Sequence, residues 1–402
     1  MSSDGIAGAI VAGGGLAGWL AALVLLRAGH RVILVEAEPR TNSGDGRSLA
    51  LSYASVRVLE TLGLWPNLAV KAAPIRQVHI SQAGHFGTLN FSAAEMGASA
   101  LGWVVPAEAV LEAFERAAAA AGADLICPAK VLEAPIDERG GLRRVEIESA
   151  ESRKNLPTRL LLIADGADSA LRQSVGIAHR RHDYHAQALV TTVAATRPQP
   201  GIAYERFTTA GVLALLPRPG DKKGLVWTLA SGLARDWADE PLERILHRAE
   251  RAIGGRLGRM SPAAPLRRFP LVGIFAQSQT ARRAVVIGNA AHSLHPVAAQ
   301  GLNLTIRDIA TLAECLTAEP DPGADAVLKR YSHSRRGDQR RTMAYTGLVR
   351  RLGELRSPPA AAMRAAGLTL ADLSRPCARK LARQGMGLVP RPLPAMVRGV
   401  PL

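Results

Sequence analysis

Aromatic residues and cysteines are scarce in this sequence. Aromatic residues occupy 4% of its 402 positions, which argues against a nucleic-acid surface that stacks bases on rings. The three cysteines, Cys127, Cys315 and Cys377, lie far apart and form no C-x-x-C pair. This spacing disfavours a disulfide framework and a zinc ribbon. A reducing environment fits this pattern, so we expect a cytoplasmic protein.

Acidic side chains are also few. The chain has 34 Asp and Glu against 50 Lys and Arg, which gives a formal net charge of +16. Such an excess favours anionic partners, among them lipid headgroups and phosphorylated cofactors. An Arg-rich composition of the source proteome accounts for the excess equally well. Because aromatic rings for stacking are few, we expect no nucleic-acid partner.

Charged residues are absent from residues 6–26, a run long enough to cross a bilayer. A secretory signal would need a positively charged start, but Asp4 is the only charged residue among the first five. A membrane helix would be weakened by the three consecutive glycines from Gly13 to Gly15, at about 1 kcal/mol each. Both of these explanations are therefore disfavoured.

The same stretch has the pattern of a dinucleotide-binding unit. A short strand, AIVA, precedes a G-x-G-x-x-G turn at Gly13, Gly15 and Gly18, and an apolar helix over residues 19–27 leads to a second strand, RVILVE. The first glycine permits a tight turn, the second lets the backbone approach a pyrophosphate, and the third lets the helix pack on the sheet. Glu36 ends the second strand, where a carboxylate can bind ribose hydroxyls.

Two later segments narrow the choice of dinucleotide. Residues 159–177 predict a strand, then Asp165-Gly166 and a helix; residues 284–316 predict a strand, Gly288-Asn289, a loop and a buried helix from about residue 301. The three segments together resemble the FAD fingerprints of the aromatic-ring flavoprotein monooxygenases, which occur in this order. The free N–H groups and positive dipole at the start of the last helix suit the negative charge of a reduced flavin.

Within that group, three stretches resemble the ubiquinone-biosynthesis hydroxylases, and most closely the polyprenyl-methoxyphenol hydroxylase branch. They read DGRSLALSYASVRVLETLGLWP, AYERFTTAGVLALLP and GNAAHSLHPVAAQGLNLTIRD. The resemblance covers residues 6–350 and implies a FAD-dependent monooxygenase. NADPH or NADH would reduce FAD, O₂ would form a flavin hydroperoxide, and this would hydroxylate the phenol ring of a polyprenyl-phenol intermediate. No metal is expected, because the flavin carries the chemistry.

The resemblance also implies which residues form the site. The cofactor-binding set is Gly13, Gly15, Leu16, Ala17, Gly18, Glu36, Arg47, Val131, Asp165, Gly166, Gly288, Asn289, Pro296, Gly301, Leu302 and Asn303. The catalytic set is Arg47, Asp165, His295, Tyr204 and Phe207. Core packing explains Tyr204 and Phe207 nearly as well as a place near the ring, and a structural role is the alternative for His295.

Three positions depart from the family pattern. Asn289 replaces an aspartate and can still form hydrogen bonds, but it carries no charge. Ala299 stands where a glycine is usual, at a cost of about 1 kcal/mol if the backbone there has a positive φ. The helix that begins Pro106-Ala107-Glu108 lacks an arginine that many relatives have, so one contact to a FAD phosphate would be missing.

Two further clusters have competing explanations. His179, His182, Asp183 and His185 could ligate a metal, but their spacing fits no regular ligand set. Residues 329–356 mix arginines with apolar residues and precede a proline-broken tail. They could dock on an anionic membrane or on partner enzymes of the pathway, or they could form an ordinary solvated helix face.

We therefore expect an α/β protein with two domains and a helical tail. A three-layer, Rossmann-like FAD-binding domain would be discontinuous, over residues 1–75, 101–178 and 275–350. A mixed β-sheet substrate domain would comprise residues 76–100 and 179–274. Residues 351–402 would form a helical and irregular tail, which is a candidate for contact with a membrane or a partner. A peripheral position on the inner membrane is a further expectation. The alternative functions are a flavin monooxygenase of a soluble aromatic or secondary metabolite, and a FAD-dependent reductase or non-catalytic FAD-binding assembly subunit.

Overall fold

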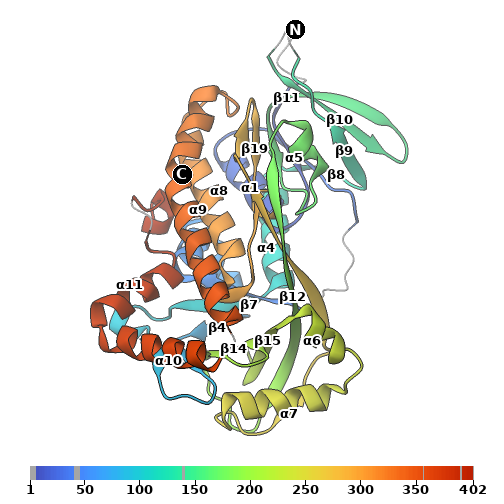
Figure 1. Ribbon diagram of the computed structural model, residues 1–402. Helices are drawn as coiled ribbons and strands as arrows, with labels where there is room; N and C mark the ends of the chain where they lie inside the picture. Colours follow the sequence, from blue (N-terminus) through green and yellow to red (C-terminus); the bar gives the residue numbers. More distant parts are fainter. Residues whose placement is uncertain (1–5, 40–45, 138–140, 356, 390–391, 402) are drawn as a thin grey trace.

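A mainly parallel sheet lies in the upper part of the molecule as drawn in Figure 1, a larger mixed sheet lies in the lower part, and long helices run beside them. The computed structural model describes residues 6–39, 46–137, 141–355, 357–389 and 392–401. Asp4 and Asp45, which belong to the segments considered above, lie outside these ranges. The expected α/β class, with a parallel sheet, a mixed sheet and C-terminal helices, is confirmed.

The parallel sheet has the strand order β18-β19-β11-β1-β2-β8. Its strands are β1 (Ala7–Ala12), β2 (Val32–Val35), β8 (Asp124–Ile126), β11 (Arg153–Ile163), β18 (Thr280–Ala281) and β19 (Ala284–Val286). Neighbours along this order pair in parallel, except β18 with β19. β2 and β19 are buried along their whole length, as expected for strands covered on both faces.

Two layers cover this sheet. On one face, α1 (Leu16–Arg27), α4 (Ala107–Ala120) and α8 (Gly301–Leu316) pack around the main apolar core. β10 (Arg143–Ser149) pairs antiparallel with β11 and with β9 (Ala129–Glu133), so both strands continue the same sheet. On the other face, these two strands and α5 (Ala170–Ser174) enclose a second apolar cluster. The uncharged run of residues 6–26 is thus β1 followed by α1. Among the described residues, no helix is both long and apolar enough to span a bilayer.

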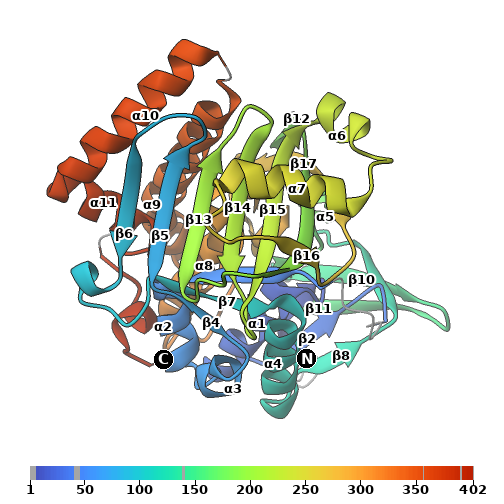
Figure 2. The ribbon, with the colours of Figure 1, turned by 90° about the horizontal axis from the view of Figure 1, so that it is seen from below.

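The mixed sheet has the order β20-β17-β12-β15-β14-β13-β5-β6, with β16 paired to β12. Its strands are β5 (Gln77–Gln82), β6 (Thr88–Ser92), β12 (His179–Ala195), β13 (Ile202–Phe207), β14 (Gly211–Pro217), β15 (Lys222–Ala230), β16 (Met260–Pro262), β17 (Arg267–Ala276) and β20 (His292–Ser293). α6 (Ser231–Asp236) follows β15, and α7 (Leu242–Ile253) crosses the outer face (Figure 2). There α7 packs Ile245 and Leu246 into a cluster with Trp227.

A small antiparallel sheet connects the two larger ones. It consists of β3 (Ser48–Ser52), β7 (Gly102–Pro106) and β4 (Ala73–Ile75), with α2 (Tyr53–Thr61), α3 (Trp65–Ala69) and the short turn η2 (Ala94–Met96) nearby in the chain. Leu51 belongs to the main core, whereas Ile75 and Val104 pack against Ala203 of β13. This small sheet therefore ties the nucleotide-binding side to the inner face of the mixed sheet.

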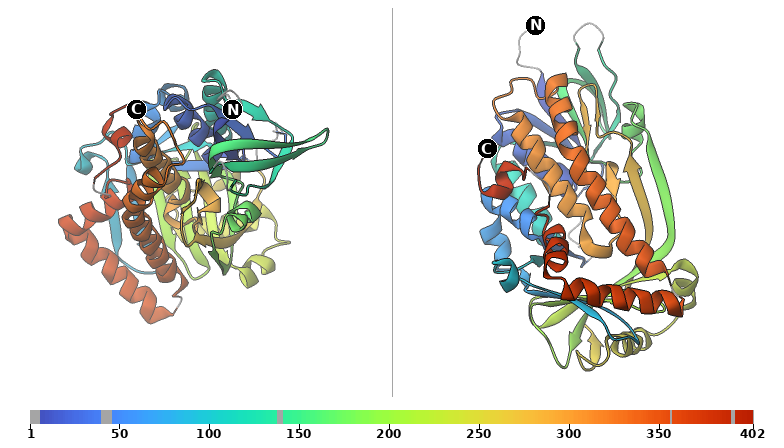
Figure 3. Two further views of the ribbon diagram at one scale, coloured as in Figure 1. Left: turned by 90° about the horizontal axis from the view of Figure 1, so that it is seen from above. Right: turned by 60° about the vertical axis from the view of Figure 1, so that its left-hand side comes forward.

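The C-terminal helices wrap around both halves. α9 (Asp325–Glu354) runs beside α8, and α10 (Pro358–Leu373) and α11 (Arg375–Gly385) turn back over the β5–β6 edge (Figure 3). Three short turns complete the fold: η3 (Gly288–Ala290), η4 (Val297–Ala299) and η5 (Ala395–Arg398). Met396 and Val397 of η5 enter the main core, so the tail is packed against the helices that cover the parallel sheet as well as against the edge of the mixed sheet.

Candidate active site

The three predicted turns begin at one edge of the parallel sheet. Ala12 at the end of β1 pairs with Ile163 at the end of β11, which pairs in turn with Val286 at the end of β19. Gly13, Asp165 and Gly288 follow these strand ends within two residues. Ligands of parallel α/β sheets bind at the carboxyl ends of the strands, so the three fingerprints converge where a dinucleotide is expected.

Glycine is required where these turns touch. Gly13 has a φ of +105°, and a Cβ on it would lie 2.5 Å from the carbonyl oxygen of Ala164 in the second turn. Gly288 has a φ of +63°, and a Cβ on it would lie 2.7 Å from the Cβ of Ala17. The first turn therefore packs directly against both of the others, and neither contact leaves room for a side chain.

The start of α1 presents unpaired backbone donors beside these contacts. Gly15 is its N-cap, with an extended backbone and no side-chain cap. Gly15 is exposed, and nothing lies within 4 Å of the position of a Cβ on it. The helix begins at Leu16, before the residue 19 expected from the sequence, because the extended Gly15 ends the turn. The first-turn N–H groups thus face open space, as in helix N-termini that bind phosphates.

Glu36 is anchored beside this turn. Its Oε2 atom accepts a hydrogen bond from the Gly14 N–H, and its Oε1 atom accepts one from the Glu38 N–H at 3.0 Å. The side chain is half-buried. Val131 lies on β9, partly buried against the second apolar cluster. Both remain predictions as cofactor contacts.

Arg172 fastens the second turn to the third. Asp165 is exposed and Gly166 has a φ of +100°. The buried guanidinium of Arg172 donates hydrogen bonds to the carbonyl oxygen of Ala167 at 3.1 Å and to that of Ala290 at 2.8 Å. The sequence indicated Arg172 only as a helix residue, because its partner across the fold could not be known.

The loop before α8 contains two consecutive alanines in the left-handed region. Ala298 has a φ of +63° and Ala299 a φ of +47°. The condition under which Ala299 would be strained is therefore met, and each such residue costs roughly 1–2 kcal/mol. The loop nevertheless keeps its hydrogen bonds, since the Ala299 N–H donates to the Pro296 carbonyl oxygen at 2.9 Å.

Asn303 holds this loop against β3. Its Oδ1 atom accepts hydrogen bonds from the Ser52 N–H at 2.8 Å and from the Ser55 hydroxyl at 2.7 Å. Its Nδ2 atom donates to the carbonyl oxygens of Ala50 at 2.8 Å and Ala299 at 2.6 Å. The amide is buried and fully used in these contacts, so Asn303 shapes the site through the backbone of its neighbours.

A cavity of about 380 Å³ lies between this loop and the inner face of the mixed sheet. Pro296 to Asn303 line one side, together with Ser48 to Ser52 of β3. The opposite wall is mostly apolar, and comes from β5, β13, β14, β15 and α11; its members include Val78, Ile80, Ala203, Val212, Ala214, Val226, Leu381 and Met386. The contribution of α11 was not predicted, because the sequence of the tail carries no signal of where it packs.

Two polar groups face this cavity from unexpected positions. Glu205 on β13 and Tyr345 on α9 both line it. Burial raises the pKa of the Glu205 carboxyl to about 7. Burial, followed by the nearby charge of Glu205, raises the pKa of the Tyr345 hydroxyl well above its usual value. A signal for Glu205 exists in the sequence, since it is a lone carboxylate in the otherwise apolar inward pattern of this strand.

Tyr204 and Phe207 flank Glu205 but differ in their surroundings. The Tyr204 ring belongs to the apolar cluster under α7, and its hydroxyl donates a hydrogen bond to Gln199, although the residue also contributes to the cavity wall. Phe207 packs with Val212 and Val297 and is not among the residues that line the cavity. Core packing thus describes both rings, and their catalytic role remains a prediction.

His295 and Arg47 also lie outside that cavity. His295 lines a separate 220 Å³ pocket with Tyr184 and Arg350. Burial and the charge of Arg350 lower the pKa of His295 to about 4, and its Nδ1 atom accepts a hydrogen bond from the Val297 N–H at 3.2 Å. This neutral ring supports the loop. The guanidinium of Arg47 lies over the Phe269 ring, 5.4 Å from its centre.

A buried ionic network fixes α8 against α9. Arg335 donates from Nε to Asp308 at 2.6 Å, and Arg307 donates from Nε to Asp338 at 2.8 Å. His292 Nε2 lies 2.7 Å from Asp308 Oδ2. One face of α9 is therefore buried. For residues 329–356 the sequence suggests a docking surface or a solvated helix face, and neither explanation includes a buried face. His292 thus connects β20 to α8.

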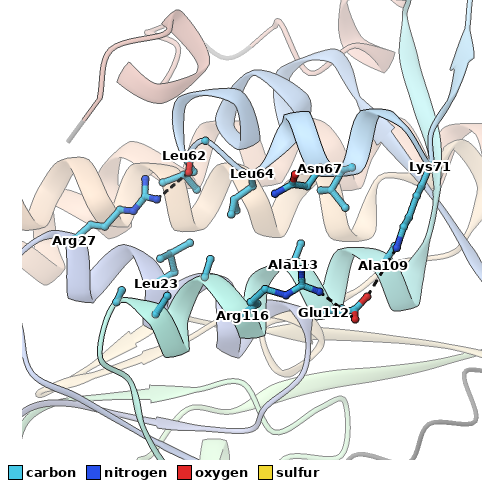
Figure 4. Close-up of a pocket in the computed structure, with 15 residues that line it drawn as sticks. Leu23, Arg27, Leu62, Leu64, Asn67, Lys71, Ala109, Glu112, Ala113 and Arg116 are labelled. Atoms are coloured by element: carbon cyan, nitrogen blue, oxygen red, sulfur yellow. Dashed lines mark hydrogen bonds and ion pairs between the residues drawn. The ribbon is translucent and has the colours of Figure 1, made fainter.

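Among the residues that the structure describes, no cluster of His, Cys, Asp or Glu could hold a metal ion. A groove of about 490 Å³ between α1, α3 and α4 lies apart from the three turns (Figure 4). In it Glu112 pairs with Arg116 at 3.1 Å and Lys71 at 4.0 Å.

Comparison with known proteins agrees with this geometry. The FAD binding domain family matches residues 7–346. The chain is 34% identical to ubiquinone hydroxylase UbiL of Rhodospirillum rubrum, with 100% of this chain and 95% of the relative covered. It is 28% identical to 3-demethoxyubiquinol 3-hydroxylase of Escherichia coli, with 94% and 98% covered. The solved p-nitrophenol 4-monooxygenase PnpA of Pseudomonas putida superimposes with a TM-score of 0.79 over 96% of this chain and 99% of that one, at 20% identity.

The chain therefore belongs to the FAD-binding aromatic hydroxylase family and is a FAD-dependent monooxygenase, as the resemblance in the sequence predicted. The residues present fit FAD. The exposed Gly15 amide and helix N-terminus leave room for a pyrophosphate, and the contacts of Gly13 and Gly288 keep the turns free of side chains there.

Proposed function

We propose that this protein hydroxylates the phenol ring of a polyprenyl-phenol intermediate in ubiquinone biosynthesis. Phenol, O₂, NAD(P)H and one proton would give the hydroxylated phenol, water and NAD(P)⁺. The observation that carries the proposal is the mostly apolar 380 Å³ cavity against the loop of the third turn, since such a site must exclude water and hold an apolar ring. The names of the two sequence relatives support the substrate class.

Each part of the site then has a task. The three turns and Glu36 would hold FAD through the cofactor-binding set given above. Bound FAD, reduced by NAD(P)H, would supply the activation of O₂. The first-turn N–H groups of α8, beginning at Gly301, would stabilise negative charge next to the ring. The apolar wall formed by β13, β14 and β15 would orient the phenol and keep water out.

Deletion of the gene tests the substrate class. Mass spectrometry of the deletion strain should show depleted ubiquinone and an accumulated prenylated phenol that lacks one hydroxyl group, and the intact gene should restore the normal profile. Unchanged ubiquinone would favour a soluble aromatic substrate. NAD(P)H oxidation by the purified protein that does not depend on any phenol would favour a reductase, and a protein that oxidises no NAD(P)H, with or without a phenol, would favour an assembly subunit.

We also propose that the outer face of α10 contacts an anionic membrane surface. Met363, Leu370 and Leu373 are 74%, 68% and 75% exposed, and their helical spacing places them on one side of α10. Exposed basic residues lie on the next helix, α11, at Arg379, Lys380 and Arg383. An apolar face with basic neighbours suits anionic lipid. Because α11 also lines the cavity, this contact would bring the cavity close to membrane-dissolved prenyl chains.

A further inference from the structure

Glu205 is an exception in the wall of the cavity. On the inward face of the sheet it lies between Ala203 and Phe207 on its own strand. In the neighbouring strands it pairs with Ala214 of β14 and Ile80 of β5. Its Oε1 atom is buried and has no hydrogen-bond partner among the described residues. A buried carboxylate without a partner is costly, by several kcal/mol, so its presence needs an explanation.

Within the described part of the chain, no cation forms an ion pair with this carboxyl. Arg206, the next residue, donates instead to the Ser81 hydroxyl at 2.8 Å and to the Ala252 carbonyl oxygen. Burial is the only cause of the raised pKa of Glu205. Among the described residues that line the cavity, the titratable ones are Glu205, Tyr345 and Tyr204, and Tyr204 hydrogen-bonds to Gln199. The carboxyl therefore faces the cavity with Tyr345 as its titratable neighbour.

The position suits a group that handles a proton of the substrate. General bases work best when their pKa is near the operating pH, and buried groups with shifted pKa values in a cleft are candidates for function. The pKa of Glu205, about 7, meets the first condition, and its place in the cavity meets the second. A phenol entering this cavity would also supply the donor that the Oε1 atom lacks.

We propose that Glu205 accepts the hydroxyl proton of the phenol during hydroxylation, with Tyr345 positioning the same oxygen. This deepens the proposed function and rests on it. The carboxylate takes the O–H proton as one oxygen atom of O₂ bonds to a ring carbon, and electron density from the phenol oxygen makes that carbon more reactive. The ring carbon then loses its own proton. As the ring becomes aromatic again, Glu205 returns its proton to the phenol oxygen, and the second oxygen atom leaves as water with the two electrons of NAD(P)H.

Ligand binding without turnover provides the first test. FAD-loaded protein is titrated, in the absence of NAD(P)H, with a short-chain prenylated methoxyphenol and with its methyl ether, and the flavin absorbance is recorded. The natural chain should bind the phenol about tenfold more tightly than the ether, the effect of one hydrogen bond to a charged group. In Glu205→Gln the two ligands should bind within about twofold of each other. Glu243→Gln, an exposed carboxylate on α7, should keep the full preference.

Turnover provides the second test. Glu205→Gln should lower kcat by about 10²-fold and should remove the acidic limb of the kcat profile, whose midpoint in the natural chain lies near pH 7. Glu205→Asp should recover part of the rate, and FAD content should stay normal in all variants. A Glu205→Gln enzyme that keeps both the preference for phenol and a kcat within about twofold overturns the role of Glu205 alone. A natural chain that hydroxylates no prenylphenol overturns the proposed function, and this role with it.

Discussion

Gly288 lies directly against Ala17, so that a Cβ on Gly288 would be 2.7 Å from the Cβ of Ala17. The contact joins the third turn of the site to the first turn of α1. Gly15, which is exposed, lies at the first of these turns, so we expect the spacing of the two turns to set the room left for a pyrophosphate. The contact would then couple correct packing of the chain to retention of FAD.

Gly288→Ala should purify with little or no FAD. The added methyl group would push the two turns apart, and the φ of +63° at this position would strain any side chain. The visible flavin absorbance per protein measures the loss. Gly367→Ala is the matched control, because it lies in α10 with no atom within 4 Å of the new methyl group, and it should retain FAD. Full FAD occupancy in Gly288→Ala would contradict the assigned contact.

The turns could be predicted from the sequence because their signal is local. Gly13, Gly15 and Gly18 specify a turn and a helix start within six residues. The apolar strands before and after this segment can be recognised from the sequence as well. The same holds for Asp165-Gly166 and Gly288-Asn289. Contacts between residues that are far apart in the sequence could not be predicted in this way. The hydrogen bond from Arg172 to the Ala290 carbonyl oxygen is an example.

Ala299→Gly should raise the free energy of unfolding by about 0.5–1 kcal/mol. Glycine adopts the left-handed backbone at φ +47° without the strain of a side chain, which stabilises the folded state. Part of this stabilisation is offset by the greater conformational freedom of glycine in the unfolded chain. Chemical denaturation monitored by circular dichroism measures the change. Ala362→Gly in the exposed interior of α10 should lower stability by about 1 kcal/mol. Changes of the same sign in the two variants would contradict this account of the loop.

Arg335→Met should lower the free energy of unfolding by about 3–5 kcal/mol, since it leaves two buried carboxylates without their shared partner. Arg336→Met, at an exposed position one residue along, should change stability by less than about 0.5 kcal/mol. Urea denaturation of both variants decides the point. Equal losses in the two variants would show that the network contributes no more to the free energy of unfolding than an exposed arginine does.

The same network predicts how stability depends on acid. Burial alone would raise the pKa of Asp308, but Arg335 and His292 hold this pKa well below its usual value. A depressed pKa in the folded state adds stability above about pH 4, the ordinary carboxyl value, and that stability is lost as the pH falls. The free energy of unfolding of the natural chain should therefore fall below about pH 4, and this fall should be smaller in Arg335→Met. An identical pH dependence of the two proteins would contradict the network's part in it.

Replacing Met363, Leu370 and Leu373 together by glutamine should weaken binding to anionic vesicles by about tenfold or more, because each buried apolar side chain contributes roughly 1.5–3 kcal/mol when fully transferred. Co-sedimentation with phosphatidylglycerol vesicles measures this binding, and neutral phosphatidylcholine vesicles test its dependence on charge. Flavin content and turnover of a short-chain phenol should be unchanged. Unaltered sedimentation of the triple variant would instead favour a protein partner or an ordinary solvated face.

Other parts of the site depended on packing that no local pattern encodes. Glu205 of β13 and Tyr345 of α9 line the same cavity because α9 packs beside β14 and η4. Leu381 and Met386 line the cavity because α11 folds back beside β6. The sequence places Arg335 and Asp338 in a segment rich in basic residues that predicts a surface position, yet both are buried with Asp308, a partner on another helix.

The most direct test of the account is the origin of the oxygen in the product. Purified protein with FAD, NADPH and a short-chain prenylated phenol is incubated under ¹⁸O₂, and the product is analysed by mass spectrometry. We expect one ¹⁸O atom in a new ring hydroxyl and one NADPH consumed per product. Oxidation of NADPH that yields hydrogen peroxide and no labelled phenol, whichever phenol is supplied, would contradict the assignment as a hydroxylase.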